Sequence, residues 1–337
     1  MQAATHTEYG SSEVLSVKDV GTPAVGPNQV LIRVHASPVT EGDRRLRAAD
    51  FPGVSAVMGR LMFGLFRPRN PIPGTMFAGQ VVACGEAVTR FSVGDDVFGS
   101  CDNGAHAEYV AVAEDGPLAE IPEGVDYDQA SAVPYGAATA LAFLRDVARV
   151  QPGEDVLIVG GSGGVGRFAV QIARHLGAHV TAVGSGRSAA MMKELGADAV
   201  IDYKREDYTK AGKRYDVIFD TTSGDGFRSA KDSLKKNGRY ATVYLNLLVL
   251  WQMLLSAVMG GPKVASAVVL GNQSLSKDVA ELLAQGVIRP TIAARHPIAH
   301  VAKAHAAQAD RDTMGSVIVT VNTAARGVSP ARALEVA

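Results

Sequence analysis

The chain has 337 residues, a length that predicts two domains. Hydrophobic residues make up 47% of it and charged residues 20%, which is typical of folded globular proteins and unlike disordered chains. The 33 basic and 34 acidic residues leave a formal charge of −1, without the basic excess usual in nucleic-acid-binding proteins, and two cysteines are too few for a disulfide framework or a four-thiolate zinc site.

The first third of the sequence predicts short β-strands. Residues 29–36 alternate between apolar and polar side chains, as a half-buried strand does. Further β-rich runs follow at residues 78–83, 93–98 and 106–113, separated by Gly, Asp and Asn. We therefore predict a β-rich domain over residues 1–124.

Strands and helices alternate after that point. Residues 155–160 form a continuous apolar run, as in a strand buried on both faces, and residues 165–176 carry one apolar helical face before Gly177. Further strands are predicted at residues 179–183, 199–201, 215–219 and 239–243, and further helices at residues 188–195, 226–236 and 277–285. This order predicts an α/β fold with a Rossmann doubly wound parallel sheet over residues 125–286. A last alternating strand at residues 316–321 would return the chain to the β-rich domain, so residues 287–337 are assigned there.

Two apolar segments stay open to more than one interpretation. Residues 51–69 are either an apolar lid over an active-site cleft or an amphipathic segment packed on the β-rich domain. Residues 243–259 either line the cleft, form a dimer contact or associate with a membrane surface, and are too short and too interrupted to span a bilayer. The first residues lack the basic and apolar regions of a secretory signal, so we expect a soluble cytoplasmic protein.

A glycine-rich loop follows the strand at residues 155–160. It carries the pattern G-x-G-x-x-G at Gly161, Gly163 and Gly166 and opens the amphipathic helix. In dinucleotide-binding loops these glycines allow a tight turn, a close backbone approach to the pyrophosphate and tight helix–strand packing. The helix N-terminus also favours an anion. The loop therefore predicts a nucleotide cofactor.

The residues after the second strand indicate which nucleotide. An NAD site places Asp or Glu about 20 residues beyond the loop, but no acidic residue occurs between Asp155 and Glu194. The chain instead offers Ser185, Arg187 and Ser188, and a guanidinium binds a phosphate through charge-assisted hydrogen bonds. This favours NADPH over NADH, unless Arg187 is only a solvated surface residue.

Five stretches follow a recurrent pattern: PIPGTMFAGQVVACGEAVTRFSVGDDVFG (71–99), GAHAEYV (104–110), PYGAATA (134–140), VLIVGGSGGVGRFAVQIARHLGAHVTAV (156–183) and LGADAVIDY (195–203). Together they resemble the medium-chain dehydrogenase/reductase superfamily, in particular its zinc-independent quinone oxidoreductase and enoyl-reductase-like branch. The resemblance implies a GroES-like catalytic domain built from both chain ends around the Rossmann domain. It also implies a homodimer formed through the edge of the Rossmann sheet.

The resemblance assigns site residues by position. Thr139 matches a Thr beside the nicotinamide end of the cofactor, and Ser162, Gly163, Gly164 and Val165 match the pyrophosphate loop. Tyr203 matches a Tyr that faces the adenosine 2′-phosphate, alongside Ser185 and Arg187; otherwise Tyr203 is a strand-end aromatic that packs on the sheet. Thr40 stands where related enzymes carry a polar side chain, so it is either the catalytic hydrogen-bond donor or a turn residue that satisfies local backbone.

Departures from the zinc-dependent relatives predict that no metal is bound. Thr75 and Met76 stand where those relatives carry His and Glu, and residues 37–43 lack their early cysteine. The spacing and context of His296, His300 and His305 do not favour a metal site, so we predict that they are solvated, and that His106 is structural.

The implied reaction is hydride transfer from NADPH to an apolar quinone or α,β-unsaturated carbonyl. Such acceptors delocalise the added charge and need less polarisation than an isolated ketone. Two other functions stay open: an NAD(P)-dependent alcohol dehydrogenase or carbonyl reductase on the same scaffold, and a cofactor-binding protein that mainly interacts with partners.

Overall fold

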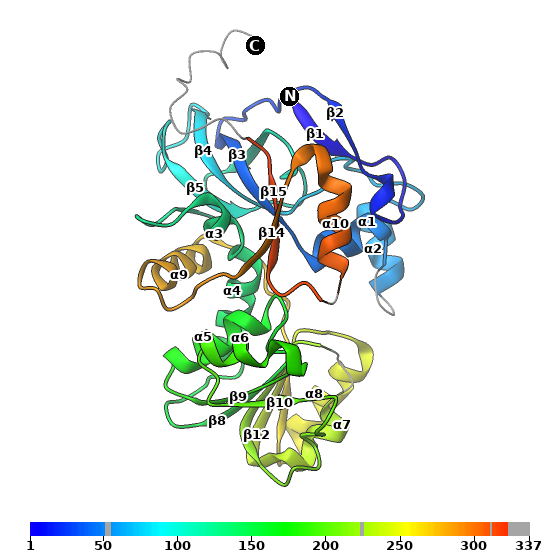
Figure 1. Ribbon diagram of the computed structural model, residues 1–337, viewed down its shortest axis with the longest axis vertical. Coiled ribbons are helices and arrows are strands. Elements are labelled where there is room, and N and C mark those ends of the chain that lie inside the picture. Colours follow the sequence, from blue (N-terminus) through cyan, green and yellow to red (C-terminus); the bar gives the residue numbers. More distant parts are fainter. Residues whose placement is uncertain (51–54, 223–225, 311, 323–337) are drawn as a thin grey trace. The chain divides into compact units, whose positions relative to one another are not determined.

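The chain folds into two structural units, each built on its own main β-sheet (Figure 1). The computed structural model describes residues 1–50, 55–222, 226–310 and 312–322. Part of the predicted lid, residues 51–54, and the end of the predicted catalytic domain, residues 323–337, lie outside the described residues.

The first unit is built mainly on antiparallel strands, as the alternating sequence predicts. Its main sheet runs in the order β14-β15-β3-β4-β5-β7, with β6 paired to β3, and only β14 and β15 run parallel to each other. The strands are β3 (Gln29–Val39), β4 (Met76–Cys84), β5 (Asp96–Ser100), β6 (Tyr109–Ala113), β7 (Leu118–Glu120), β14 (Ile292–Pro297) and β15 (Ser316–Thr320). A smaller sheet pairs β1 (Gln2–Thr5) with β2 (Ser16–Asp19). The last strand, β15, pairs with β3, so the C-terminal segment returns to the sheet that the N-terminal segment begins.

Short helices complete the first unit. They are η1 (Ser12–Val14), α1 (Glu41–Ala48), α2 (Ser55–Phe63), α3 (Tyr127–Ser131), α9 (Gln273–Ala284), η5 (Ile298–His300) and α10 (Val301–Ala309). The apolar faces of β3, β4, β5 and β15 form the core with the buried residues of α10. α1 begins directly after β3, and this position brings its first turn close to the start of β4.

The second unit is a Rossmann-like parallel sheet. Its strands run in the order β10-β9-β8-β11-β12-β13, all parallel. They are β8 (Asp155–Val159), β9 (His179–Gly184), β10 (Ala199–Asp202), β11 (Tyr215–Asp220), β12 (Leu234–Thr242) and β13 (Lys263–Ala265). The strand β8 is almost wholly buried, which explains its continuous apolar sequence.

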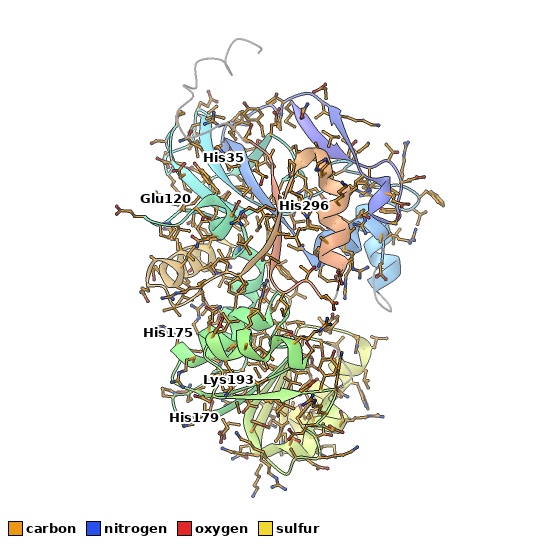
Figure 2. All side chains as sticks on the ribbon, viewed as in Figure 1. His35, Glu120, His175, His179, Lys193 and His296 are labelled. Atoms are coloured by element: carbon orange, nitrogen blue, oxygen red, sulfur yellow. The ribbon has the colours of Figure 1, made fainter. Side chains whose placement is uncertain are left out.

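The helices of this unit are α4 (Pro134–Leu141), η2 (Ala142–Val147, a π-helix), α5 (Gly166–His175), η3 (Gly186–Ser188), α6 (Ala189–Glu194), α7 (Phe227–Ala230), η4 (Lys231–Ser233) and α8 (Leu247–Met259). The amphipathic pattern at residues 165–176 correctly predicts α5, and Gly177 takes the left-handed φ of +82° that ends it. His175 and His179 lie at the α5–β9 connection (Figure 2). No helix in the described part of the chain is long and apolar enough to cross a membrane.

Two details differ from the predicted boundaries. The helix predicted at residues 226–236 stops at Ser233, because Leu234 is buried and pairs with Tyr215 in the sheet, so sheet pairing overrides local helix preference. The predicted Rossmann range of residues 125–286 also included α9. In the structure α9 contacts β7 and belongs to the first unit, whose described residues lie within 1–134, 271–284 and 290–322.

Candidate active site

The glycine loop between β8 and α5 is shaped by two close backbone approaches. A Cβ atom on Gly166 would lie 2.0 Å from the carbonyl oxygen of Gly160, and one on Gly163 would lie 3.2 Å from the same oxygen. Gly166 therefore permits the tight packing of helix on strand. A Cβ on Gly164 would meet nothing within 4 Å, so the backbone there borders open space.

Backbone donors remain available at this open side. In the part of the chain that the structure describes, the N–H groups of Gly164 and Val165 donate to no protein acceptor. No side chain caps the start of α5 either, and Ser162 is half-buried beside these groups. Uncapped N–H groups at a helix N-terminus favour an anion. The predicted residues Ser162, Gly163, Gly164 and Val165 thus form a loop that fits a nucleotide pyrophosphate.

A buried cation follows the loop directly. Arg167 is 5% exposed, and burial lowers the pKa of its guanidinium to about 10, so it stays charged at neutral pH. Its charge adds to the positive end of α5. The sequence analysis did not single out Arg167, because an arginine after a glycine loop has no distinctive spacing.

Helix α4 packs against the same loop. A Cβ on Gly136 would lie 2.4 Å from the carbonyl oxygen of Gly164, so α4 approaches the loop at this glycine. Thr139 lies one turn further along α4 and is buried. The structure therefore holds Thr139 on the helix that borders the loop.

The predicted ribose residues gather where β9 and β10 end. Ser185 and Arg187 lie on the turn after β9, and Arg187 is exposed. Tyr203 follows β10, donates its N–H to the Gly184 carbonyl at 3.1 Å and exposes most of its side chain. Ser185 is half-buried, and its hydroxyl lies 3.3 Å from that of Ser188.

An acidic residue also stands at this end of the sheet, where the sequence analysis expected none. A Cβ on Gly186 would lie 2.5 Å from Oδ2 of Asp202, the last residue of β10. The Asp202 carboxylate accepts the N–H of Lys204 at 3.1 Å and pairs with Arg205 at 3.7 Å. Sequence reasoning missed Asp202 because it considered only the strand next to the loop, whereas this carboxylate comes from the neighbouring strand.

In the first unit, Thr40 forms the N-cap of α1. Its Oγ1 accepts the N–H of Asp43 at 3.1 Å, and its own N–H donates to Asp43 Oδ2 at 2.8 Å, so the two residues form a capping box. The Thr40 hydroxyl also donates to Asp43 Oδ2 at 2.6 Å. The local alternative for Thr40, a residue that satisfies backbone, therefore describes what its side chain does in this structure.

The Asp43 carboxylate accepts hydrogen bonds from the hydroxyls of both Thr40 and Thr75. Asp43 is 1% exposed, and its Oδ1 accepts a hydrogen bond from the Thr75 hydroxyl at 3.0 Å. Sequence analysis missed Asp43, although the spacing Thr-x-x-Asp before a helix is the signature of a capping box. The carboxylate thus joins the start of α1 to the start of β4.

Buried histidines surround the next turn of α1, which corrects the prediction that His305 is solvated. His305 and His106 are fully buried, with ring centroids 5.3 Å apart, and Nη1 of Arg47 lies 2.8 Å from Nδ1 of His305. His106 Nδ1 lies 2.8 Å from the Ser37 hydroxyl, which supports its predicted structural role. His305 points inward because it lies on the face of α10 that packs on the sheet beside Val301 and Ala304.

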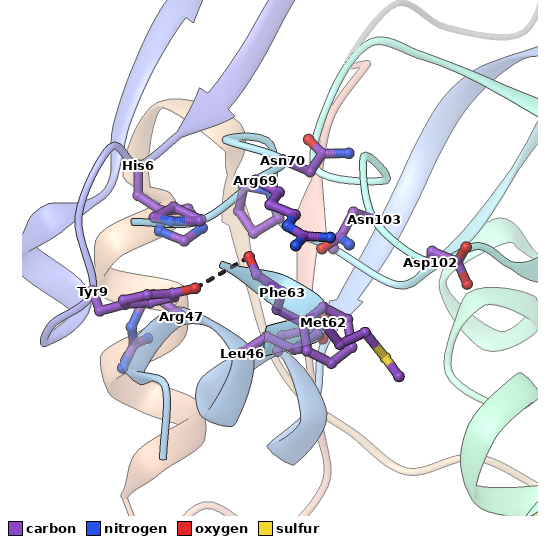
Figure 3. Close-up of a pocket in the computed structure, with 14 residues that line it drawn as sticks. His6, Tyr9, Leu46, Arg47, Met62, Phe63, Arg69, Asn70, Asp102 and Asn103 are labelled. Carbon is purple, nitrogen blue, oxygen red and sulfur yellow. Dashed lines mark hydrogen bonds between the residues drawn. The ribbon is translucent and has the colours of Figure 1, made fainter. Parts of the chain in front are cut away.

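A pocket of about 310 Å³ opens beside Asp43 and Arg47 (Figure 3). Leu46, Met62, Phe63 and Pro73 supply apolar wall, and Arg69 and Asn70 supply polar groups. The Tyr9 hydroxyl donates to the carbonyl oxygens of Phe63 at 3.1 Å and Gly64 at 2.7 Å. The described end of α2 is therefore tied to this unit and forms one wall of the pocket.

The described residues contain no group of three or more His, Cys, Asp or Glu arranged to hold a metal ion. Thr75 is bonded to Asp43, and Met76 is buried in β4. Burial raises the pKa of the Cys101 thiol to about 12, so this thiol is protonated at neutral pH.

Comparison with known proteins gives a consistent family. Residues 26–123 match the alcohol dehydrogenase GroES-like domain, and residues 195–319 match the family described as zinc-binding dehydrogenase. The human mitochondrial NAD(P)H oxidoreductase RTN4IP1 is 30% identical over 95% of this chain and 89% of its own length. The 2-methylene-furan-3-one reductase of Solanum lycopersicum is 30% identical over 88% of this chain and 72% of its own length.

The solved structure of the quinone oxidoreductase from Coxiella burnetii covers 96% of this chain and 99% of its own, with a TM-score of 0.84 and 27% identity. Because one of these relatives is mitochondrial by name, cytoplasmic location stays a prediction for this chain.

Proposed function

The chain belongs to the medium-chain dehydrogenase/reductase superfamily, and on that premise we propose that it transfers a hydride from NADPH to a quinone or an α,β-unsaturated carbonyl without zinc. The observation that carries the proposal is the loop at Gly164, whose open backbone and unused N–H groups suit a pyrophosphate. Thr75 and Met76, at the positions of the zinc-binding His and Glu of metal-dependent relatives, support the zinc-independent assignment.

We assign the cofactor to residues of the second unit. Ser162, Gly163, Gly164 and Val165 would hold the pyrophosphate, and Thr139 would border the nicotinamide end. Ser185, Arg187 and Tyr203 would hold the 2′-phosphate. Arg205 supports the preference for NADPH, because it partly offsets the negative charge of Asp202 at this end of the sheet.

Bound NADPH would supply the hydride, and this chain's residues would orient the acceptor and stabilise the charge that develops on its oxygen. We assign the pocket beside Asp43 to the acceptor, since its walls are largely apolar and suit a quinone or enone. We assign to Thr40 the donation of a hydrogen bond to the acceptor oxygen. For this the hydroxyl would turn from Asp43, which would keep its bonds to the Thr40 N–H and the Thr75 hydroxyl.

The test is steady-state oxidation of NADPH and NADH with matched panels of quinones, enones and aldehydes. The proposal predicts turnover with quinones or enones, a higher kcat/KM with NADPH, and activity that survives chelation in protein free of zinc. Turnover confined to aldehydes would assign a carbonyl reductase instead. Tight NADPH binding without turnover of any acceptor would assign a cofactor-binding role.

We also propose a homodimer through the edge of the second sheet. β13 ends the strand order and pairs only with β12 in the described part of the chain, so one of its edges is available for pairing. Sedimentation equilibrium would give the mass of a dimer, and a monomer at all concentrations would contradict it.

A further inference from the structure

The sequence around α2 and β4 has an unusual local charge. Residues 51–85 contain no aspartate or glutamate, although the whole chain has a formal charge of −1. They contain three arginines: Arg60, Arg67 and Arg69. Of these three, only Arg69 lines the pocket beside Asp43. The positive charge of this stretch therefore reaches the pocket through Arg69.

The fold does not use the Arg69 guanidinium. In the part of the chain that the structure describes, it makes no hydrogen bond and no ion pair, whereas Nη1 of Arg60 donates to the Leu65 carbonyl at 3.2 Å. Burial raises the pKa of the Tyr9 phenol, and the charges of Arg60 and Arg69 act against that rise. Since Tyr9 also lines the pocket, the Arg69 charge acts on groups inside it.

Backbone contacts hold the loop that carries Arg69. Gly64 takes a φ of +125°, and a Cβ there would lie 2.0 Å from a carbonyl oxygen of the loop, so this tight turn requires glycine. The Arg69 N–H donates to the Phe63 carbonyl at 2.8 Å. Further along, the His6 N–H donates to the Pro71 carbonyl at 2.9 Å and ties the loop to the segment after β1. The backbone of Arg69 is therefore fixed at the pocket.

Two amide side chains line the pocket together with Arg69. Asn70 Oδ1 accepts the Ile72 N–H at 3.0 Å, and Asn70 Nδ2 donates to no described residue. The Asn103 side chain makes no hydrogen bond to the described residues either. Figure 3 shows these two amides on the same side of the pocket as the Arg69 guanidinium, with the Asp102 carboxylate directed away from them. N–H donors that lack acceptors beside a guanidinium suit a carboxylate.

The two buried charged residues of the pocket are engaged within the fold. Asp43 accepts hydrogen bonds from the Thr40 N–H and from the hydroxyls of Thr40 and Thr75. Arg47 is 5% exposed, and its Nη1 lies 2.8 Å from Nδ1 of His305. Their opposite charges also offset each other at the pocket. A ligand that enters therefore meets mainly the charge of Arg69.

From these observations we propose that the acceptor carries a carboxylate, which Arg69 binds at the exposed side of the pocket. The proposal rests on the assignment of this pocket to the acceptor of the proposed reaction. Tyr9 and Phe63 offer ring surfaces to a planar quinone or enone, and the carboxylate extends from it towards Arg69. Arg69 and Asn70 are exposed, so the carboxylate loses less of its hydration there than at a buried site, and the guanidinium fork binds both of its oxygens.

The experiment compares two naphthoquinones that differ only in bearing a carboxylate or the corresponding primary amide, with NADPH as the donor. The unaltered chain should show a KM at least about tenfold lower for the carboxylate, because its hydrogen bonds to Arg69 are charge-assisted. This preference should shrink in about 0.5 M salt, which screens an exposed ion pair. Arg69→Gln should abolish the preference and leave kcat and KM for the amide unchanged, and Arg69→Lys, which keeps the charge, should retain part of it.

The matched control is Arg67→Gln, which removes an exposed arginine of the same loop that does not line the pocket and should keep the preference. Thermal melts check that each variant folds. Equal KM values for the two quinones, or the same loss in Arg67→Gln as in Arg69→Gln, would overturn the carboxylate site and leave the proposed reaction intact.

A second measurement needs no turnover. In calorimetric titrations the unaltered chain should bind naphthoate at least about tenfold more tightly than naphthamide, and Arg69→Gln should bind the two alike. Equal affinities in the unaltered chain would also overturn the proposal. A chain that reduces no acceptor would contradict the proposed reaction, whereas these titrations decide the carboxylate site by themselves.

Discussion

The buried histidines of the first unit predict that its stability falls steeply below pH 6.5. Burial lowers the pKa of His6, His106 and His305, and the nearby Arg47 lowers the pKa of His305 and His6 further. Asp43 acts in the opposite sense on His106, and the Glu8 carbonyl does so on His6. The folded unit therefore binds fewer protons than the unfolded chain just below pH 6.5, the ordinary histidine value.

The sign and the size of this pH dependence follow from the linkage between proton binding and folding. Because the unfolded state binds more protons, the free energy of unfolding rises with pH between each folded pKa and 6.5, and falls as the pH drops through that window. Each such histidine contributes up to about 1.4 kcal/mol per pH unit, so three contribute up to about 4 kcal/mol per unit. Above pH 6.5 their contribution is fully present. Carboxylates with lowered pKa values, such as Glu41 and Asp216, make the free energy of unfolding depend on pH only below about pH 4.5.

Urea unfolding followed by circular dichroism between pH 5 and 8 measures this slope. Trp251 lies in the second unit, so its fluorescence follows that unit separately. His305→Gln keeps an acceptor for Arg47 but cannot be protonated, and should reduce the slope below pH 6.5 by up to about 1.4 kcal/mol per unit. His175→Gln, at an exposed position in the second unit (Figure 2), is the matched control. An identical slope in His305→Gln and the unaltered chain would refute the reasoning.

Three further predictions concern the cofactor and the acceptor. Arg187→Ala should weaken NADPH binding by about 1–3 kcal/mol in calorimetry with little effect on NADH, and Asp202→Asn should strengthen NADPH; equal changes for both cofactors would contradict the 2′-phosphate assignment. Gly166→Ala should destabilise the second unit by about 1–3 kcal/mol, because the added Cβ would lie 2.0 Å from the Gly160 carbonyl oxygen. Gly164→Ala should keep the melting temperature of the unaltered chain and lose cofactor affinity, because its Cβ would enter the open space beside the loop. Normal NADPH binding by Gly164→Ala would exclude the loop as the pyrophosphate site. Thr40→Val should lower stability by about 1 kcal/mol as a cap is lost and reduce kcat far more than Thr75→Val, while a lowered melting temperature with unchanged kcat would leave Thr40 a capping residue only.

The sequence predicted the architecture because each element satisfies its own periodicity. α5 carries a single apolar face and β8 a continuous apolar run, so both could be placed without tertiary information. The end of the helical segment that begins with α7 could not be placed in this way, because its helical pattern continues into Leu234. In the structure Leu234 is part of the sheet and pairs with Tyr215. The position of α9 also depends on a contact with β7, more than a hundred residues away.

The residues of the candidate site likewise differ in whether local sequence or the fold brings them together. The loop glycines stand in a local motif that the sequence displays, whereas Thr40 was predicted only from its position in the family resemblance. Asp202 reaches Gly186 from a neighbouring strand, and His305 meets Arg47 across 258 residues of sequence. No spacing within either segment signals such an encounter, because it depends on how strands and helices are ordered in the fold.

The Asp43 carboxylate determines when Thr40 could act on an acceptor. The Thr40 hydroxyl now makes a charge-assisted hydrogen bond to Asp43 at 2.6 Å, a type that contributes about 1.5–3 kcal/mol. A neutral acceptor carbonyl would return only about 0.5–1.5 kcal/mol, so the hydroxyl stays with Asp43 while the acceptor is uncharged. If negative charge developed on the acceptor oxygen during hydride transfer, the competing hydrogen bond would become charge-assisted as well, and the Thr40 hydroxyl could turn towards it. Donation by Thr40 would then belong to the transition state, so Thr40→Val should lower kcat and kcat/KM together and leave KM nearly unchanged. A variant with raised KM and unaltered kcat would place the interaction in the ground state and contradict this order of events.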